Sequence, residues 1–352
     1  MIDKEHPLAR DLEEILRHTD GLWHELRGAR IFVTGGTGFF GAWLLESFLW
    51  ANRRCALGAE VVVLSRDPQA AVRRHPQFAQ APGLRWHQGD VRTFEYPAGE
   101  FACVIHAAAD APRARADTPP LDLVSTIMDG TRRVLELARA RGIRKVLFAS
   151  SGAVYGPQPP DVGQIDESFA GAPDTSDPRS AYGEGKRAAE MLCALYRASA
   201  GMEPKVARCF AFVGPHLPLD TVYAVGNFIR DALAGGPIRV ESQGLAVRSY
   251  LYAADLAAWL WTILLRGAPC RPYNVGSDHA VTVAEVARMV ADASGPNVEV
   301  VIASKPSLGG AGGRYIPSVE RARTELGLDT WTDLPEAIRR TLAWHRSAER
   351  LG

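Results

Sequence analysis

The sequence predicts an α/β fold built on a doubly wound parallel sheet, with a smaller C-terminal α/β part. Short apolar runs suited to buried strands alternate with segments of helical periodicity from residue 29 to about residue 210. A glycine-rich turn at residues 35–41 joins the first apolar run to the helical segment after it. Beyond residue 214 the alternation weakens and short strands mix with helices, which indicates the smaller C-terminal part.

The expected elements follow in chain order. Residues 1–28 carry apolar side chains at helical spacing, which predicts one or two amphipathic helices before the first strand. Strands are expected at residues 29–33, 60–64, 84–88, 101–105, 145–148, 205–210, 238–240 and 298–301. Helices are expected at residues 42–49, 121–141, 181–200, 283–293 and 334–349. The stretch 156–180 is rich in Pro, Gly, Asp and Ser and is expected to be a loop.

Composition excludes several classes of protein. Lys plus Arg equals Asp plus Glu at 40 each, so no net field favours nucleic acid or a membrane surface as a partner. The five cysteines are odd in number and form no Cys-x-x-Cys pair, which favours reduced thiols over disulfides or a metal site. The N-terminal residues lack the apolar segment of a secretory signal, and no apolar run is long enough to span a membrane. We therefore expect a cytoplasmic protein.

The glycine-rich turn predicts a dinucleotide site. Gly35, Gly38 and Gly41 lie between a buried strand and a helix, where glycines permit a tight turn and close approach of the backbone to a pyrophosphate. The N-terminus of the following helix supplies free N–H groups and a partial positive charge. The alternative is a strand-to-helix turn without a ligand, which the flanking strand and helix disfavour.

This turn leads to a division of the chain. Residues 1–28 are expected to form an N-terminal helical extension. Residues 29–210, with about 240–268, are expected to form an NAD(P)-binding Rossmann domain, and residues 211–239 and 269–352 a substrate-binding domain.

A second pattern predicts catalysis. Tyr182 and Lys186 are four positions apart, so on a helix both side chains project from one face. A nearby ammonium group lowers the pKa of a phenol, so that Tyr182 can act as acid or base near neutral pH. Ser151 follows an expected strand, at the sheet edge where open α/β folds bind ligands, and can hydrogen-bond the reacting oxygen. A Tyr-x-x-x-Lys pair alone is often a chance surface pair, but its combination with the glycine turn and Ser151 favours a catalytic set.

With these motifs the chain resembles the extended short-chain dehydrogenase/reductase family, in particular its nucleotide-sugar epimerases, dehydratases and reductases. The resemblance runs from about residue 30 to residue 344. Its features, in order, are Thr34-Gly35-Gly36-Thr37-Gly38-Phe39-Phe40-Gly41, Gly89-Asp90-Val91, His106-Ala107-Ala108-Ala109, Gly130-Thr131, Ser151, Tyr182 with Lys186, Gly214-Pro215, Arg248 with Asp255, and Tyr273-Asn274-Val275-Gly276.

The resemblance implies roles for these positions. The cofactor-binding residues are expected to be Gly35, Thr37, Gly38, Phe39, Phe40, Gly41, Ser65, Arg66, Asp90, Val91, Ala107, Ala108, Ala109, Tyr182 and Lys186. Ser151, Asn227 and Arg248 are expected to bind the substrate, with Arg248 on its diphosphate. The alternatives are a surface Arg248 paired with Asp255, and Asn227 as a helix cap.

Two further expectations concern neighbouring parts of the chain. His106 is expected to be a packed, hydrogen-bonded residue and not an acid or base. Relatives commonly form homodimers through the two helices that carry Gly130-Thr131 and the Tyr-Lys pair, which here include Leu135, Leu137, Leu192 and Leu195. A homodimer is therefore expected.

Departures from the family narrow the reaction. Nucleotide-sugar dehydratases carry Asp-Glu, or at least Glu, after the catalytic Thr or Ser, whereas this chain has Gly152 and Ala153, which cannot move a proton. Ile127 and Ala211 stand where relatives usually have asparagine. The sequence thus predicts an NAD(P)-dependent nucleotide-diphosphate-sugar epimerase or 4-ketoreductase, with hydride transfer at sugar C4. The alternatives are a nucleotide-sugar dehydratase and a non-catalytic NAD(P)-sensing protein on the same fold.

The end of the second strand bears on which dinucleotide binds. NAD-preferring sites place a carboxylate there for the ribose hydroxyls, whereas this chain has Ser65 and Arg66, which suit a 2′-phosphate. The alternatives are that Asp67 folds back to the ribose or that Arg66 stacks on adenine. The sequence favours NADP over NAD.

Overall fold

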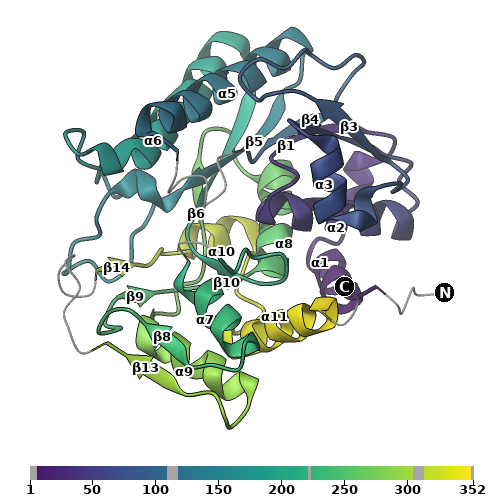
Figure 1. Cartoon of the computed structure of the whole chain (residues 1–352). Helices are drawn as coiled ribbons and strands as arrows, with labels where there is room; N and C mark the ends of the chain where they lie inside the picture. The colour runs from purple at the N-terminus through teal and green to yellow at the C-terminus, as the bar shows by residue number, and fades with distance from the viewer. Residues whose placement is uncertain (1–5, 109–117, 221–222, 304–312, 350–352) are drawn as a thin grey trace.

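A seven-stranded parallel sheet forms the centre of the protein, whose structure is a computed structural model describing residues 6–108, 118–220, 223–303 and 313–349 (Figure 1). The strand order is β11-β6-β5-β4-β1-β2-β3, and every neighbouring pair is parallel. This topology confirms the predicted doubly wound fold. Its strands are β1 (Arg30–Thr34), β2 (Glu60–Ser65), β3 (Leu84–Gln88), β4 (Cys103–His106), β5 (Lys145–Ser151), β6 (Glu203–Cys209) and β11 (Pro272–Val275).

Helices cover both faces of this sheet. On one face α2 and α8 pack together, and on the other α5 packs along α6. Strand β1 serves both layers, because Ile31 and Val33 join the core under α2 and α8 while Phe32 joins the core under α5 and α6. The helices are α1 (Ala9–His18), α2 (Phe39–Arg54), α3 (Pro68–Arg74), α5 (Pro120–Ala140), α6 (Ala181–Ala200), α7 (Ala224–Leu233), α8 (Ala253–Arg266), α9 (Val283–Ser294), α10 (Glu320–Leu326) and α11 (Leu334–Glu349).

A smaller part follows β6 and contains short strands packed with α7, α9 and α11. Strand β8 (Ile238–Val240) pairs with β13 (Val300–Ile302), and β7 (Phe212–Val213) pairs with β10 (Leu251–Tyr252). Strand β9 (Val247–Arg248) lies between β12 (Val281–Thr282) and β14 (Arg314–Tyr315). Strand β11 belongs to the central sheet, although the sequence assigned its residues to the substrate-binding part. Apart from this strand, the division into domains stays a prediction.

The sequence missed helix α8 for a physical reason. Every residue from Ala253 to Leu265 is buried, so the helix lacks the exposed polar face by which a surface helix is recognised in a sequence. It packs against both α2 and α1. Among the described helices none is long and apolar enough to cross a bilayer.

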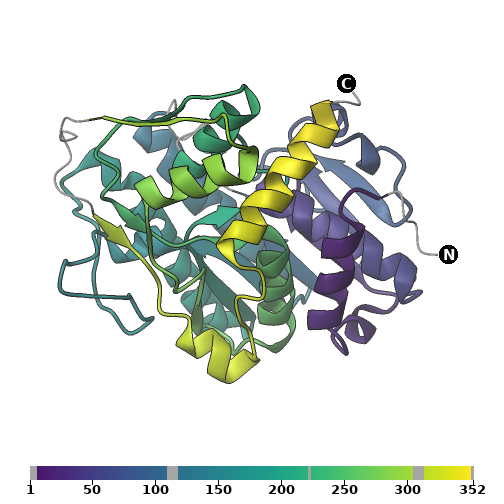
Figure 2. The ribbon, with the colours of Figure 1, turned by 90° about the horizontal axis from the view of Figure 1, so that it is seen from below.

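The N-terminal helix α1 is held by a buried ion pair. The carboxylate of Asp11 accepts hydrogen bonds from the Tyr252 hydroxyl at 2.9 Å and from the Arg340 guanidinium at 2.5 Å. Arg340 also pairs with Glu14 at 2.6 Å and with Glu336 at 2.8 Å. Figure 2 shows α1 beside α11. The first and last described helices are thereby joined through one guanidinium.

We expect Arg340→Met to lower the free energy of unfolding by about 3 kcal/mol, because Asp11 is left buried without its cation. Arg339→Met is the matched control, since Arg339 is exposed and pairs only with Glu336 in the described structure. This control should cost less than about 1 kcal/mol. Chemical denaturation followed by circular dichroism measures both, and equal losses would contradict the buried pair's role.

Candidate active site

The glycine-rich turn is closely packed at both ends. A Cβ added to Gly35 would lie 2.4 Å from the carbonyl carbon of Ala107, and Gly35 has a positive φ of 76°. A Cβ on Gly41 would lie 2.2 Å from the Gly35 oxygen. Gly38 is the N-cap of α2 and supplies no side-chain cap. The first N–H groups of α2 therefore face the turn, as an anion site at a helix N-terminus requires.

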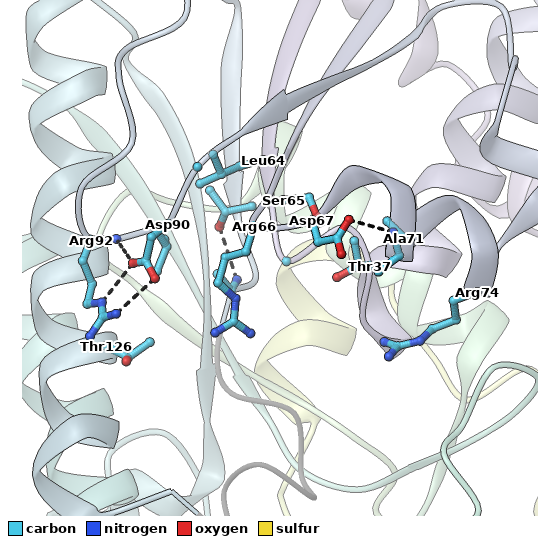
Figure 3. A pocket seen from close by; sticks show the side chains of 16 residues that line it. Thr37, Leu64, Ser65, Arg66, Asp67, Ala71, Arg74, Asp90, Arg92 and Thr126 are labelled. Carbon is cyan, nitrogen blue, oxygen red and sulfur yellow. Dashed lines mark hydrogen bonds and ion pairs between the residues drawn. The ribbon is translucent and has the colours of Figure 1, made fainter.

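A pocket of about 260 Å³ lies beside this turn, at the ends of β2 and β3 (Figure 3). Its lining includes seven residues predicted to bind the cofactor: Gly35, Thr37, Ser65, Arg66, Asp90, Val91 and Ala108. Asp90 is held by Arg92 through hydrogen bonds of 2.9 and 3.1 Å, which lower the pKa of its carboxyl below the ordinary value. Ala109 lies outside the described residues.

Two arginines extend into the space at this pocket, as Figure 3 shows for Arg66 and Arg74. Both are exposed, and neither guanidinium has a carboxylate within ion-pair distance among the described residues. Asp67 accepts a hydrogen bond from the Ala70 N–H at 2.9 Å and is thereby the N-cap of α3. Arg74 was not predicted from the sequence, because nothing local shows that α3 turns its last residues toward the end of β2.

A second cavity, of about 440 Å³, opens at the carboxyl ends of β5 and β6. It brings together Ser151, Tyr182 and Lys186, as predicted. Arg248 and three further predicted cofactor residues, Phe39, Phe40 and Ala107, also line it. The remaining lining is largely apolar and aromatic: Ala149, Ser150, Ala153, Cys209, Phe210, Ala211, Phe212, Leu217, Tyr223, Ala224, Val225, Tyr250, Val283 and Tyr315.

Lys186 is buried against the end of β5. Its ammonium group donates to the carbonyl of Ala149 at 2.7 Å and lies 4.8 Å from the ring centroid of Phe148. The same group lies 5.9 Å from the ring centroid of Tyr182. A Cβ on Gly183 would lie 2.7 Å from the carbonyl oxygen of Ala153, so this glycine lets α6 approach the segment after Ser151. The cation and the phenol are therefore held beside the serine.

A polar network behind the cavity fixes these elements. The Glu190 carboxylate accepts hydrogen bonds from the Ser150 hydroxyl and from the Arg208 guanidinium, the latter as short as 2.6 Å. Arg208 donates to the Tyr155 hydroxyl at 2.9 Å, which donates to the amide oxygen of Asn274 at 2.8 Å. This network ties β5, α6, β6 and β11 together, and the sequence analysis did not identify it.

His106 is a structural residue, as predicted. Its ring nitrogens contact the hydroxyls of Thr34 at 2.7 Å and of Thr131 at 3.0 Å. Burial, with the nearby charge of Lys186, lowers the pKa of His106 to about 3. The ring is therefore neutral at physiological pH and links β1, β4 and α5.

The predicted substrate residues have different surroundings. Arg248 donates to the carbonyls of Val247 at 2.8 Å and Gly313 at 2.6 Å and lines the cavity. It is not paired with Asp255, which is buried and accepts from the backbone N–H groups of residues 331 and 332 at 3.0 and 2.9 Å. Asn227 accepts a hydrogen bond from Arg230 at 3.3 Å and is not part of the cavity lining, so its role in binding stays a prediction.

Of the leucines expected at a dimer interface, Leu195 is exposed, whereas Leu135 and Leu137 are not. Leu135 and Leu137 are buried within the subunit against the central sheet. The exposed large apolar residues of α5 and α6 are Leu121, Met191 and Leu195. Leu135 and Leu137 were thus misassigned, because both faces of α5 carry leucine and only the tertiary packing distinguishes them.

The two cavities are adjacent at the segment after β4, where the neighbours Ala107 and Ala108 line one each and Ala107 packs against Gly35. An extended ligand with one end beside Arg66 and the other beside Tyr182 suits this arrangement. The fold and the Ser-Tyr-Lys set therefore define an enzyme of the short-chain dehydrogenase/reductase type with a dinucleotide cofactor.

Comparison with known proteins defines the family. The chain belongs to the NAD dependent epimerase/dehydratase family, whose model matches residues 31–276. It is 30% identical over 311 residues to UDP-glucuronic acid decarboxylase 6 of Arabidopsis thaliana, covering 88% of this chain and 86% of that relative.

Solved structures share the architecture. UDP-glucose 4-epimerase of Thermotoga maritima has a TM-score of 0.77 at 22% identity, covering 91% of this chain and 99% of its own. UDP-glucose 4-epimerase of Thermus thermophilus, solved as a complex with NAD, has a TM-score of 0.73 at 27% identity with the same coverage. The first shows the fold alone, and the second also supports an NAD(P) cofactor for this chain.

We expect Gly41→Ala to weaken dinucleotide binding by at least about tenfold, because the added methyl group displaces the Gly35 carbonyl and with it the turn. Gly163→Ala is the control, since nothing lies within 4 Å of a Cβ there and its φ is not positive. Calorimetric titration with NAD⁺ and NADP⁺ measures both variants. Unchanged affinity of Gly41→Ala would show that the turn does not hold the cofactor.

Proposed function

We propose that this enzyme oxidises and reduces C4 of a nucleotide-diphosphate sugar, as a 4-epimerase or as a 4-ketoreductase. The observation that carries the proposal is the convergence of Ser151, Tyr182 and Lys186 on a cavity that Arg248 also lines. The segment after Ser151 offers no acid or base, because it continues as Gly152 and Ala153. The side chains that line the cavity therefore support the redox step at C4 best.

The side chains support the following mechanism. Tyr182, as phenolate, accepts the proton of the C4 hydroxyl, and the Ser151 hydroxyl donates a hydrogen bond to the same oxygen. Lys186 favours the phenolate electrostatically from its buried position. The nicotinamide, when bound, supplies the hydride acceptor and donor. Arg248 orients the substrate through its diphosphate, for which a guanidinium has suitable donors.

A second candidate function is decarboxylation of a nucleotide-linked uronic acid. Relatives named UDP-glucuronic acid decarboxylases, at 29–30% identity, favour it. Such a reaction also begins with oxidation at C4, so the Ser-Tyr-Lys set is compatible with it. The missing carboxylate at positions 152 and 153 favours the epimerase or ketoreductase, and it also disfavours 4,6-dehydration. The intact catalytic set argues against a non-catalytic NAD(P)-sensing protein.

We further propose a homodimer through α5 and α6, whose exposed apolar residues fit such an interface.

The test is mass spectrometry of a panel of nucleotide sugars incubated with the enzyme, with and without added NADPH. Epimerisation leaves the mass unchanged and yields a second isomer on chromatography, ketoreduction adds two hydrogens, and decarboxylation removes CO₂. We expect one of the first two. Tyr182→Phe should abolish turnover and retain dinucleotide binding. Turnover of this variant within a few-fold of wild type would refute the catalytic assignment, and loss of CO₂ would favour the second candidate.

We also propose that NADP is the preferred cofactor. The carboxylate of Asp67 is engaged as the N-cap of α3, which argues against its folding back to a ribose. Arg66 lies at the end of β2, and Arg74 adds a second cation to the same pocket. Two guanidinium groups in the pocket at the end of β2 support recognition of a 2′-phosphate.

For Arg66→Ala we expect the affinity for NADP⁺ to fall by about tenfold or more, with little change for NAD⁺, because a charge-assisted hydrogen bond to the 2′-phosphate is lost. Arg288→Ala is the control, because Arg288 is also an exposed arginine and lines neither cavity. Titrating both dinucleotides against all three proteins measures this. Equal weakening of both would show that Arg66 does not recognise the 2′-phosphate.

A further inference from the structure

Tyr315 comes to the cavity from a distant part of the chain. It lies on β14, which pairs in parallel with β9 so that Tyr315 is the partner of Arg248. Its side chain lines the same cavity as Ser151 and Tyr182. Neither the sequence motifs nor the mechanism above assigns it a role.

The position of the Tyr315 ring is fixed by two contacts. Its centroid lies 4.6 Å from that of Phe210, on the segment after β6. Its hydroxyl lies where a side chain at position 152 would project, since a Cβ on Gly152 would be 2.6 Å from the Tyr315 oxygen and 2.7 Å from the Phe210 ring. Gly152 thus provides the space in which Tyr315 reaches the end of β5.

The Ser151 hydroxyl lies near enough to the Tyr315 oxygen to lower the pKa of that phenol, against the larger opposing effect of burial. A serine hydroxyl has one hydrogen to donate and two lone pairs that accept. The backbone N–H of Ala153 donates to Ser151 at 3.1 Å and occupies one lone pair. Burial raises the pKa of Tyr315 well above its ordinary value, so this phenol keeps its proton and can donate to the other lone pair. The Ser151 hydrogen is then left for an acceptor in the cavity.

We propose that Tyr315 is a positioning residue of the reaction centre: by donating to Ser151 it directs the Ser151 hydrogen toward the C4 oxygen of the substrate. This inference rests on the proposed function. Successive hydrogen bonds from Tyr315 to Ser151 and from Ser151 to the substrate oxygen also polarise the Ser151 hydroxyl. Its hydrogen bond to the substrate oxygen is thereby strengthened as negative charge develops there. No proton is transferred between Tyr315 and Ser151, since Tyr182 remains the acid and base.

The experiment is a double-mutant cycle of Tyr315→Phe and Ser151→Ala, measured on the substrate that the nucleotide-sugar panel identifies. Tyr315→Phe keeps the ring against Phe210 and should lower kcat by about tenfold, the value of one neutral hydrogen bond, with KM and dinucleotide affinity within about twofold. In the Ser151→Ala background the same change should have no further effect on kcat. Equal effects in both backgrounds, or an unchanged kcat in Tyr315→Phe alone, would overturn the proposal.

Tyr273→Phe is the matched control, because it removes a tyrosine hydroxyl that contacts Glu325 and the Ala268 N–H, outside the cavity. It should leave kcat unchanged.

A second measurement does not depend on turnover. With carbon-13 at the tyrosine Cζ, the Tyr315 resonance is the one absent from Tyr315→Phe, and Ser151→Ala should shift it because the hydrogen bond is lost. An unmoved resonance would overturn the proposal even if a substrate is found. If no sugar in the panel reacts with the wild type, the proposed function fails, and the resonance still decides whether Tyr315 engages Ser151.

Discussion

The burial of Lys186 is the constraint on which the proposed catalytic centre depends. An ammonium group removed from water must be satisfied by the protein, and here the Ala149 carbonyl and the Phe148 ring contribute to this. Both belong to the end of β5, so satisfying the cation fixes α6 against that strand. Tyr182, one helical turn earlier, is thereby placed beside Ser151, and Gly183 permits the approach. The same contact that stabilises the packing sets the reacting geometry.

The surroundings of this contact are polar as well as buried. Behind it, Glu190 binds both Ser150 and Arg208, so that α6 is tied to β5 and β6 by charged hydrogen bonds. Removing Glu190 or Arg208 would leave the other charged group buried without its counter-charge. Such a network is therefore costly to break and rigid when intact. Rigidity is useful here, since the hydroxyl groups of the site act through directed hydrogen bonds that tolerate little displacement.

Local patterns were sufficient for the framework of the fold and for much of the site. Strand and helix periodicity, the glycines at 35, 38 and 41, and the spacing of Tyr182 and Lys186 are each contained in a few residues, and the structure places them as the patterns indicate. Contacts between distant segments left no such signal. Arg74 enters the cofactor pocket only because α3 folds back, and the inward orientation of Leu135 follows from how α5 packs.

Tyr315 shows why the last step of specificity is the hardest to deduce from sequence. Gly152 indicates that an acid is missing after Ser151, but the sequence does not say what fills its place. The structure fills it with two aromatic side chains, of which Phe210 follows β6 and Tyr315 lies on β14. A carboxylate at this point would meet both rings and could not be accommodated without displacing them. An acidic side chain at position 152 and the Tyr315 phenol would therefore compete for the same space, so the end of β5 holds one or the other.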